Sequence, residues 1–225
     1  MNTLLHRFPS LAYVAPFAAF MVFLGLSSRV PVGLRTYSLL WLVMVGAVLW
    51  AFSRAAISWK APNWVKSGVL GIAVFLLWIA PDLLFPDWRE HWLITNGITG
   101  KAEGSAPPEG WHDPLVLALR TMRAVILVPI VEELFWRGWL PRWSDNMDDF
   151  RKVPLGSYSR LAFWATAVLF ALEHGAMWDV GLMAGVAYNW WMMKTRSLGD
   201  LILTHAVTNA CLSGYVMIQG QWQYW

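Results

Sequence analysis

Cysteine and charged residues are both scarce in this chain. A single cysteine, Cys211, is present among 225 residues, which excludes an intramolecular disulfide and a metal cluster built on cysteines. Asp, Glu, Lys and Arg together make up 14% of the residues, whereas soluble domains carry about 25%. Because 57% of the residues are hydrophobic and the mean hydropathy is +0.45, the composition argues against a soluble globular protein.

The chain also lacks internal repeats, low-complexity tracts and runs of charge. We therefore expect one integral membrane domain over residues 1–225. The net charge of +3 and the isoelectric point near 9.2 come from basic residues that are scattered between apolar stretches and form no DNA-binding or RNA-binding pattern. We expect contact with the lipid bilayer and no nucleic-acid partner.

Long apolar stretches recur along the chain, and several can cross a hydrocarbon core of about 30 Å. We interpret them as about seven transmembrane helices, within a range of six to eight, which predicts an all-α polytopic helix bundle. Seventeen tryptophans support this because many stand near the ends of these stretches, where Trp favours the headgroup layer. The stretches cover residues 11–28, 37–57, 65–85, 115–141, 159–177, 180–194 and 199–218.

The predicted loops differ in their content of basic residues, and this difference predicts the orientation. With a cytoplasmic N-terminus, ten basic residues fall on the cytoplasmic side and four on the other, in agreement with the positive-inside rule. The C-terminus is then extracytoplasmic. The ten are Arg7, Arg54, Lys60, Lys66, Arg142, Arg151, Lys152, Arg160, Lys194 and Arg196, and the four are Arg29, Arg35, Arg89 and Lys101.

Three ionisable residues stand together inside the fourth stretch. Such side chains cost about 2.5–3.5 kcal/mol each in the middle of a membrane helix and by default mark a functional interior. Glu133 and Arg137 are four residues apart and can pair along one helix face, while Glu132 points about 100° away. We expect Glu133 to hold the helix in place and the desolvated Glu132 to suit proton transfer. The alternative is a salt-bridged helix end at the cytoplasmic surface.

Two further stretches bring polar groups into the membrane. His174 ends the fifth stretch, and His205 and Asn209 are four residues apart on the seventh. Each could serve packing alone, since His and Asn hydrogen-bond between membrane helices. Glu132, His205 and Asn209 nevertheless come to similar depths, about 8–15 Å from the inner ends of their helices, which favours one common polar site. His174 fits this depth less well, at about 21 Å.

Two weaker signals accompany these residues. We interpret Asn189, on the sixth stretch, as a bridge between helices rather than as a lining residue of the site. Pro129 stands three residues before Glu132 and removes a helix hydrogen bond. It can kink the helix beside the carboxylates or simply bend it for packing.

The order of these groups resembles the motifs of a known family. Glu-Glu-x-x-x-Arg at 132–137, Phe-x-x-x-His at 170–174 and His-x-x-x-Asn at 205–209 are similar to those of the CAAX protease and bacteriocin-processing family, also called the Abi family. Its members are intramembrane proteases of the type II CAAX prenyl endopeptidase kind. The resemblance covers a core of about residues 113–218. Phe-Trp-Arg-Gly at 135–138 looks similar to bacterial members that accompany exosortase systems.

The resemblance implies a multi-pass endopeptidase of the bacterial cytoplasmic membrane. Its substrate would be a membrane-associated protein or peptide, and prenylated substrates are not expected in a bacterial setting. The six motif residues carry three implied roles. Glu132 and His174 would activate the attacking water, His205 and Asn209 would stabilise the oxyanion of the tetrahedral intermediate, and Glu133 and Arg137 would support this arrangement.

The use of a metal cofactor stays open at this point. Glu132, His174 and His205 make a zinc-like ligand set with a fourth position for water. They come from three helices rather than from an HExxH motif. Water held by protein groups alone is the alternative.

Two other functions could use the same polar residues. A non-catalytic membrane scaffold or immunity-type binding protein would keep them as a buried network, and a proton-coupled transporter would use them as a proton relay. The chain shows no two-half repeat of the kind common in carriers, which argues against transport. All six chemical groups that hydrolysis needs are present, which favours the peptidase over the scaffold.

Overall fold

Helices form the fold throughout the part of the chain that the structure describes. The computed structural model describes residues 3–26, 29–97, 99–100 and 107–224. In these ranges β structure is limited to one isolated bridge between Asn96 and Gly100, so the predicted all-α class is confirmed. The α-helices are α1 (Thr3–Arg7), α2 (Leu11–Leu26), α3 (Leu34–Ser53), α4 (Trp64–Leu84), α5 (Pro114–Met122), α6 (Val128–Glu133), α7 (Leu140–Asp145), α8 (Arg160–Glu173), α9 (Trp178–Thr195) and α10 (Leu198–Gln219).

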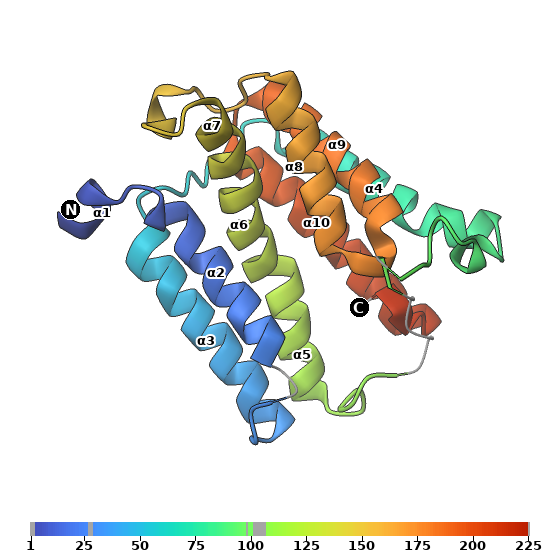
Figure 1. The fold of residues 1–225 in the computed structure, drawn as a ribbon. Helices are drawn as coiled ribbons and strands as arrows, with labels where there is room; N and C mark the ends of the chain where they lie inside the picture. The colour runs from blue at the N-terminus through green and yellow to red at the C-terminus, as the bar shows by residue number, and fades with distance from the viewer. Residues whose placement is uncertain (1–2, 27–28, 98, 101–106, 225) are drawn as a thin grey trace.

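A single long helix, Pro114–Asp145, runs through the middle of the bundle (Figure 1). It consists of α5, α6 and α7 joined by two π-helical turns, Arg123–Leu127 and Leu134–Trp139. π-helical turns insert an extra residue into a helix and often occur at functional sites. Both turns flank α6, the segment that carries the two glutamates.

The start of this long helix is set by Asp113. Its carboxylate accepts two backbone N–H groups of the first turn, and Pro114 occupies the first helical position, where its missing N–H is not needed. The guanidinium of Arg35, at the start of α3, donates a hydrogen bond to the same carboxylate. This hydrogen bond lowers the pKa of Asp113, so the cap stays ionised at neutral pH.

Four helices of the described part of the chain are long and apolar enough to cross a membrane. They are α3, α4, the long helix Pro114–Asp145, and α10. The predicted count of about seven spans is not confirmed. Helices α2 and α8 have 16 and 14 residues, or about 24 and 21 Å at 1.5 Å per residue, which is shorter than a hydrocarbon core of about 30 Å. Helix α9 has 18 residues, but polar side chains interrupt it. The structure is thus a membrane helix bundle with four candidate spans.

Close helix pairs hold the bundle together. Helix α10 packs along α4, α8 along α9, and α2 along α3. Gly71 lets α4 approach α10, because a Cβ atom there would lie 2.8 Å from Val207 Cβ. At the same crossing, Thr208 Oγ1 donates a hydrogen bond of 3.0 Å to the Gly71 carbonyl. Small residues allow such approach between membrane helices, and this crossing fixes the position of the half of α10 that carries His205 and Asn209.

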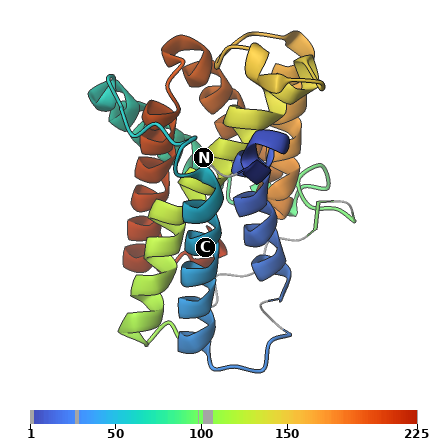
Figure 2. The same ribbon diagram turned by 90° about the vertical axis from the view of Figure 1, so that its left-hand side faces the viewer.

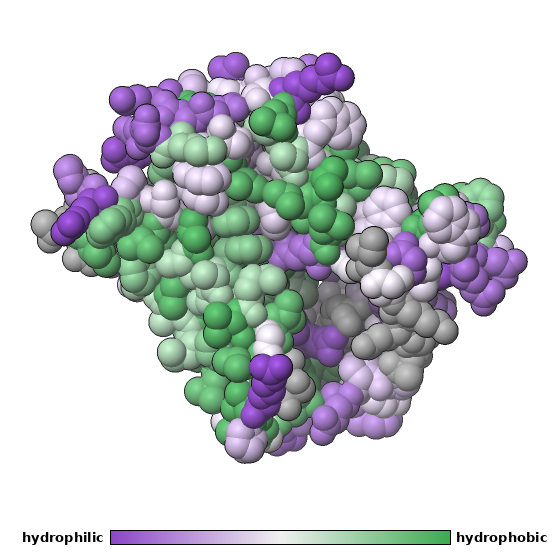
Figure 3. Space-filling view, in the orientation of Figure 1, coloured by the Kyte–Doolittle hydropathy of each residue, from purple (hydrophilic) through white to green (hydrophobic). Residues whose placement is uncertain are grey.

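The outer surface suits a lipid environment. Hydrophobic side chains cover the flank formed by α2 and α3, while hydrophilic side chains gather near α7 (Figure 3). Large apolar residues of α3 such as Val43 and Trp50 are exposed. In the perpendicular view, α3 runs beside the long helix, with which it makes contact (Figure 2). The bundle therefore presents apolar sides and polar ends.

Candidate active site

A cavity of about 240 Å³ lies among the helices. Glu132 from α6, His174 from the end of α8, and His205 and Asn209 from α10 all line it. The structure therefore brings these four residues, predicted from three separate motifs, around one space. Glu133 and Arg137 are not among its lining residues and lie behind it. The rest of the lining is mainly apolar and aromatic.

Glu132 is the lining carboxylate of this cavity. Its side chain is buried, with 5% of the residue exposed. Its Oε2 atom is buried and has no hydrogen-bond partner within the described residues. A buried carboxylate oxygen without a partner is costly and calls for a ligand such as water or a substrate group.

The neighbouring Glu133, unlike Glu132 Oε2, has hydrogen-bond partners for its carboxylate oxygens. It is fully buried, and Arg137 Nη1 donates to both of its carboxylate oxygens at 3.0 and 3.2 Å. His205 Nδ1 lies 2.8 Å from Glu133 Oε1. The predicted pairing of Glu133 with Arg137 is present, and the same carboxylate also orients an imidazole of the cavity. Because an ionised carboxylate only accepts hydrogen bonds, Nδ1 of His205 carries a proton.

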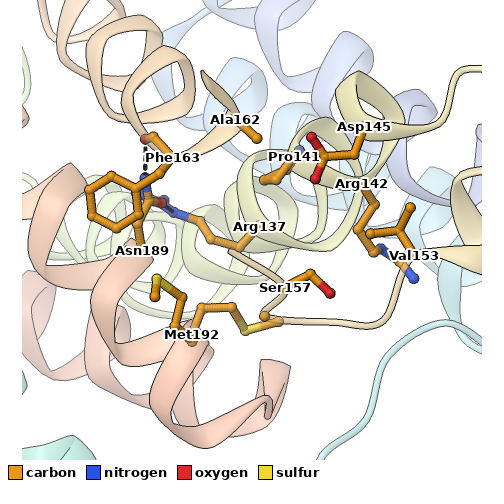
Figure 4. A pocket seen from close by; sticks show the side chains of 12 residues that line it. Arg137, Pro141, Arg142, Asp145, Val153, Ser157, Ala162, Phe163, Asn189 and Met192 are labelled. Atoms are coloured by element: carbon orange, nitrogen blue, oxygen red, sulfur yellow. Dashed lines mark hydrogen bonds between the residues drawn. The ribbon is translucent and has the colours of Figure 1, made fainter. Parts of the chain in front are cut away.

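Arg137 is held from several sides. Its Nε donates to Asn189 Oδ1 at 3.0 Å, and its guanidinium lies 4.3 Å from the centre of the Phe170 ring. Asn189 Nδ2 in turn donates to the Phe163 carbonyl at 2.8 Å, as Figure 4 shows. Asn189, on α9, therefore connects this helix to the long helix and to α8, and it lines a smaller pocket of about 30 Å³ behind Arg137. The interpretation of Asn189 as a bridging residue agrees with this position.

His174 stands directly after the last residue of α8. Its Nδ1 lies 2.7 Å from the Phe170 carbonyl, and because a carbonyl oxygen only accepts, Nδ1 carries the proton. Nε2 of the neutral ring then has the lone pair and is available as a proton acceptor. The ring packs edge-on against Trp78, with 5.2 Å between the ring centres. Helix α8 ends at Glu173, so His174 reaches the cavity wall from the end of its helix.

Asn209 is tied to the first π-helical turn. The Val128 N–H donates to the Arg123 carbonyl, and Pro129 has no N–H to donate to the carbonyl of Ala124, five residues earlier. Asn209 Nδ2 donates to that carbonyl at 2.8 Å. The irregular helix beside Pro129 is thus stabilised by α10, and one N–H of the Asn209 carboxamide remains for the cavity.

Three residues near the site were not identified from the sequence. Tyr188 donates from its hydroxyl to Thr208 Oγ1 at 2.9 Å, and its ring centre lies 5.1 Å from that of His205. Trp78 lines the cavity, and its Nε1 is buried without a partner in the described residues. Glu173 accepts a hydrogen bond of 2.9 Å from Trp136 Nε1. Only Glu173 carried a usable signal, because it is ionisable and lies in an apolar helix.

A metal ion does not fit the way these side chains are arranged. Within the residues that the structure describes, no group of three or more His, Cys, Asp or Glu side chains is placed to hold one. The hydrogen bonds of His174 Nδ1 to Phe170 and of His205 Nδ1 to Glu133 leave the Nε2 atoms of both rings for the cavity. The donor set fits better with the alternative, a water molecule held by protein groups.

A protein-family model matches part of the chain. Residues 114–211 match the family model described as Type II CAAX prenyl endopeptidase Rce1-like. The matched segment contains Glu132, Glu133, Arg137, His174, His205 and Asn209 and lies inside the predicted core of residues 113–218. No curated protein and no solved structure matches the chain.

Proposed function

We propose that this chain, whose residues 114–211 are a domain of the Rce1-like type II CAAX prenyl endopeptidase family of proteases, is an intramembrane endopeptidase with its catalytic core at 113–218. Its substrate is a membrane-associated protein or peptide. The observation that carries the proposal is the convergence of Glu132, His174, His205 and Asn209 on one cavity of about 240 Å³.

Glu132 and His174 activate the attacking water in this proposal. Glu132 offers a carboxylate oxygen without a partner, and His174 offers Nε2 because its Nδ1–H is directed to the Phe170 carbonyl. A water molecule has two protons and can donate one hydrogen bond to each group. Glu132 takes the proton as the water oxygen adds to the carbonyl carbon of the substrate, a general-base step in a site shielded from bulk solvent.

His205 and Asn209 stabilise the oxyanion that forms in this addition. Asn209 contributes its remaining N–H. The Nδ1–H of His205 is directed to Glu133, and in this proposal the second N–H of the protonated ring, at Nε2, makes the contact with the oxyanion. Donors fixed before the reaction are typically worth about 10²–10³ in kcat each. Glu133 and Arg137 act as positioning residues, since they orient His205 and do not line the cavity.

The second half of the reaction returns the proton. The tetrahedral intermediate collapses, the bond between carbon and nitrogen breaks, and Glu132 gives its proton to the leaving amine. The products are a new carboxyl terminus and a new amino terminus. Atoms and protons balance with water as the sole co-reactant.

The location of this activity follows from the apolar spans. The chain is a multi-pass membrane protein by its four long apolar helices. We propose the bacterial cytoplasmic membrane as its location, with a cytoplasmic N-terminus and an extracytoplasmic C-terminus. The proposed subgroup is the one that accompanies exosortase systems, for which a substrate other than a prenylated protein is expected.

The proposal is tested by comparing membrane and secreted peptides from cells that carry the native chain or a variant. Glu132→Ala and His174→Ala are the active-site variants. Glu90→Ala and His91→Ala are matched controls, because both residues are exposed and lie away from the cavity. We expect a set of cleaved peptides to disappear in the first pair and to persist in the controls, with equal protein abundance. Unchanged processing in both active-site variants would refute the peptidase function.

A further inference from the structure

Two arginines line the same cavity as the catalytic residues. Arg120 and Arg123 are both only partly exposed, and both belong to the cavity wall. The carboxylate in that wall, Glu132, stands nine residues after Arg123 along the same helix. At about 1.5 Å per residue this places the Arg123 backbone about 13 Å from Glu132 along the helix axis. The cavity thus has a carboxylate toward one end and guanidinium groups toward the other.

Arg123 is held in place without a charged partner. Its guanidinium lies 4.7 Å from the centre of the Trp41 ring, a cation–π contact, and Trp41 is buried, with 1% exposed. Among the described residues, the Arg123 side chain forms no ion pair and donates no hydrogen bond. Five other basic side chains do pair with carboxylates: Arg35, Arg89, Arg137, Arg151 and His205. A half-buried guanidinium with five free N–H groups is a site for an anionic oxygen group.

We infer that Arg123, with Arg120 adding positive charge beside it, forms a subsite for a carboxylate of the peptide substrate. This inference rests on the proposed peptidase function and names a class of substrate for it. An extended peptide advances about 3.3 Å per residue, so 13 Å corresponds to about four residues. The recognised carboxylate therefore lies about four residues from the cleaved bond.

A lipid phosphate is the rival occupant, and the position of Arg123 argues against it. An arginine that binds headgroups extends along the helix surface toward the polar layer. The Arg123 guanidinium instead lies over the ring of a buried tryptophan and faces the space that Glu132 and His174 also face. A group that reaches it must enter the cavity, as a substrate does.

The inference is tested by peptide binding to the full-length Glu132→Gln chain in maltoside micelles, where cleavage does not interfere. The probes are labelled apolar peptides that carry one Glu or the matching Gln, each with a free or an amidated C-terminus. We expect about tenfold tighter binding of the peptides that present a carboxylate. The four combinations separate a side-chain carboxylate from a terminal one.

Second-site variants assign the preference to Arg123. Added Arg123→Gln is expected to abolish the preference, and Arg123→Lys to retain a few-fold preference, since Lys keeps the charge but loses the planar fork. Arg29→Gln is the matched control, because Arg29 is exposed and does not line the cavity. Equal binding of acidic and neutral peptides, or a preference that survives Arg123→Gln, would overturn the inference.

Two further arms separate the remaining outcomes. Added phosphatidylglycerol is expected to leave the preference unchanged, and loss of the preference in its presence would instead assign the subsite to a lipid phosphate. Cleavage of the same peptides by the native chain is measured separately. Glu is placed two to seven residues from the cleaved bond, a range that includes the ~13 Å spacing between Arg123 and Glu132. Selective binding without cleavage would refute the proposed function and leave the subsite intact.

Discussion

Replacement by glutamine should affect thermal stability differently at the adjacent residues Glu132 and Glu133. Glu132 and Glu133 are both buried, but Glu133 is hydrogen-bonded to Arg137 and close to His205 Nδ1. Glu132 Oε2 has no partner in the described part of the chain. Glutamine keeps the shape of the side chain and removes its charge. Glu133→Gln and Glu132→Gln therefore form a matched pair at neighbouring positions.

The expected magnitudes follow from these contacts. Removing one partner of a buried ion pair typically costs about 3–5 kcal/mol, because the other charge stays buried without compensation. Glu133→Gln leaves the positive charge of Arg137, a residue that is 2% exposed, buried without its carboxylate partner. For a chain of this size, 1 kcal/mol shifts Tm by about 2–4 °C, so we expect a decrease on the order of 10 °C. Glu132→Gln removes a carboxylate that lacks compensation, so Tm should stay unchanged or rise.

Thermal unfolding in detergent micelles measures both effects. The 17 tryptophans provide an intrinsic fluorescence signal, and peptide cleavage is assayed on the same samples. Both variants should lose cleavage, but only Glu133→Gln should lose stability. The reasoning is wrong if Glu132→Gln destabilises the protein as strongly as Glu133→Gln does, or if Glu133→Gln melts at the temperature of the native chain.

Three further predictions concern packing and cofactors. Gly185→Val should lower Tm by several degrees, because a Cβ added there would lie 3.1 Å from the Ala167 carbonyl oxygen and overpacking costs about 1–3 kcal/mol. A Tm equal to that of the native chain would contradict this. Asn189→Leu should cost about 1–3 kcal/mol, since it leaves buried Arg137 Nε without its acceptor, and thermal unfolding measures this loss. A zinc chelator should leave peptide cleavage unchanged, because no group of three or more metal-ligating side chains is arranged for a metal in the described residues; inhibition reversed by added zinc would contradict this.

Local features of the site could be predicted from the sequence. The four-residue spacing of Glu133 and Arg137 predicted their contact because residues i and i+4 share one face of a helix. The three polar motifs in long apolar stretches predicted a common site because such groups are costly in a membrane. Both expectations depend on neighbours along one helix or on composition, which a single sequence contains.

Contacts between distant elements could not be predicted in this way. The approach of His205 to Glu133 spans 72 residues and depends on how α10 packs against the long helix. The π-helical turn before Pro129 depends on Asn209, which satisfies the Ala124 carbonyl from another helix. The predicted number of spans rested on apolar length alone, and stretches 159–177 and 180–194 became the shorter α8 and the more polar α9.

Isotope labelling in H₂¹⁸O shows whether Glu132 drives the addition of water to a peptide bond. The purified native chain and Glu132→Gln, each in proteoliposomes, are incubated with a library of apolar peptides, and the products are read by mass spectrometry. We expect new carboxyl termini that carry ¹⁸O with the native chain and none with Glu132→Gln. Products of equal yield from both proteins, or no labelled termini from the native chain, would contradict it.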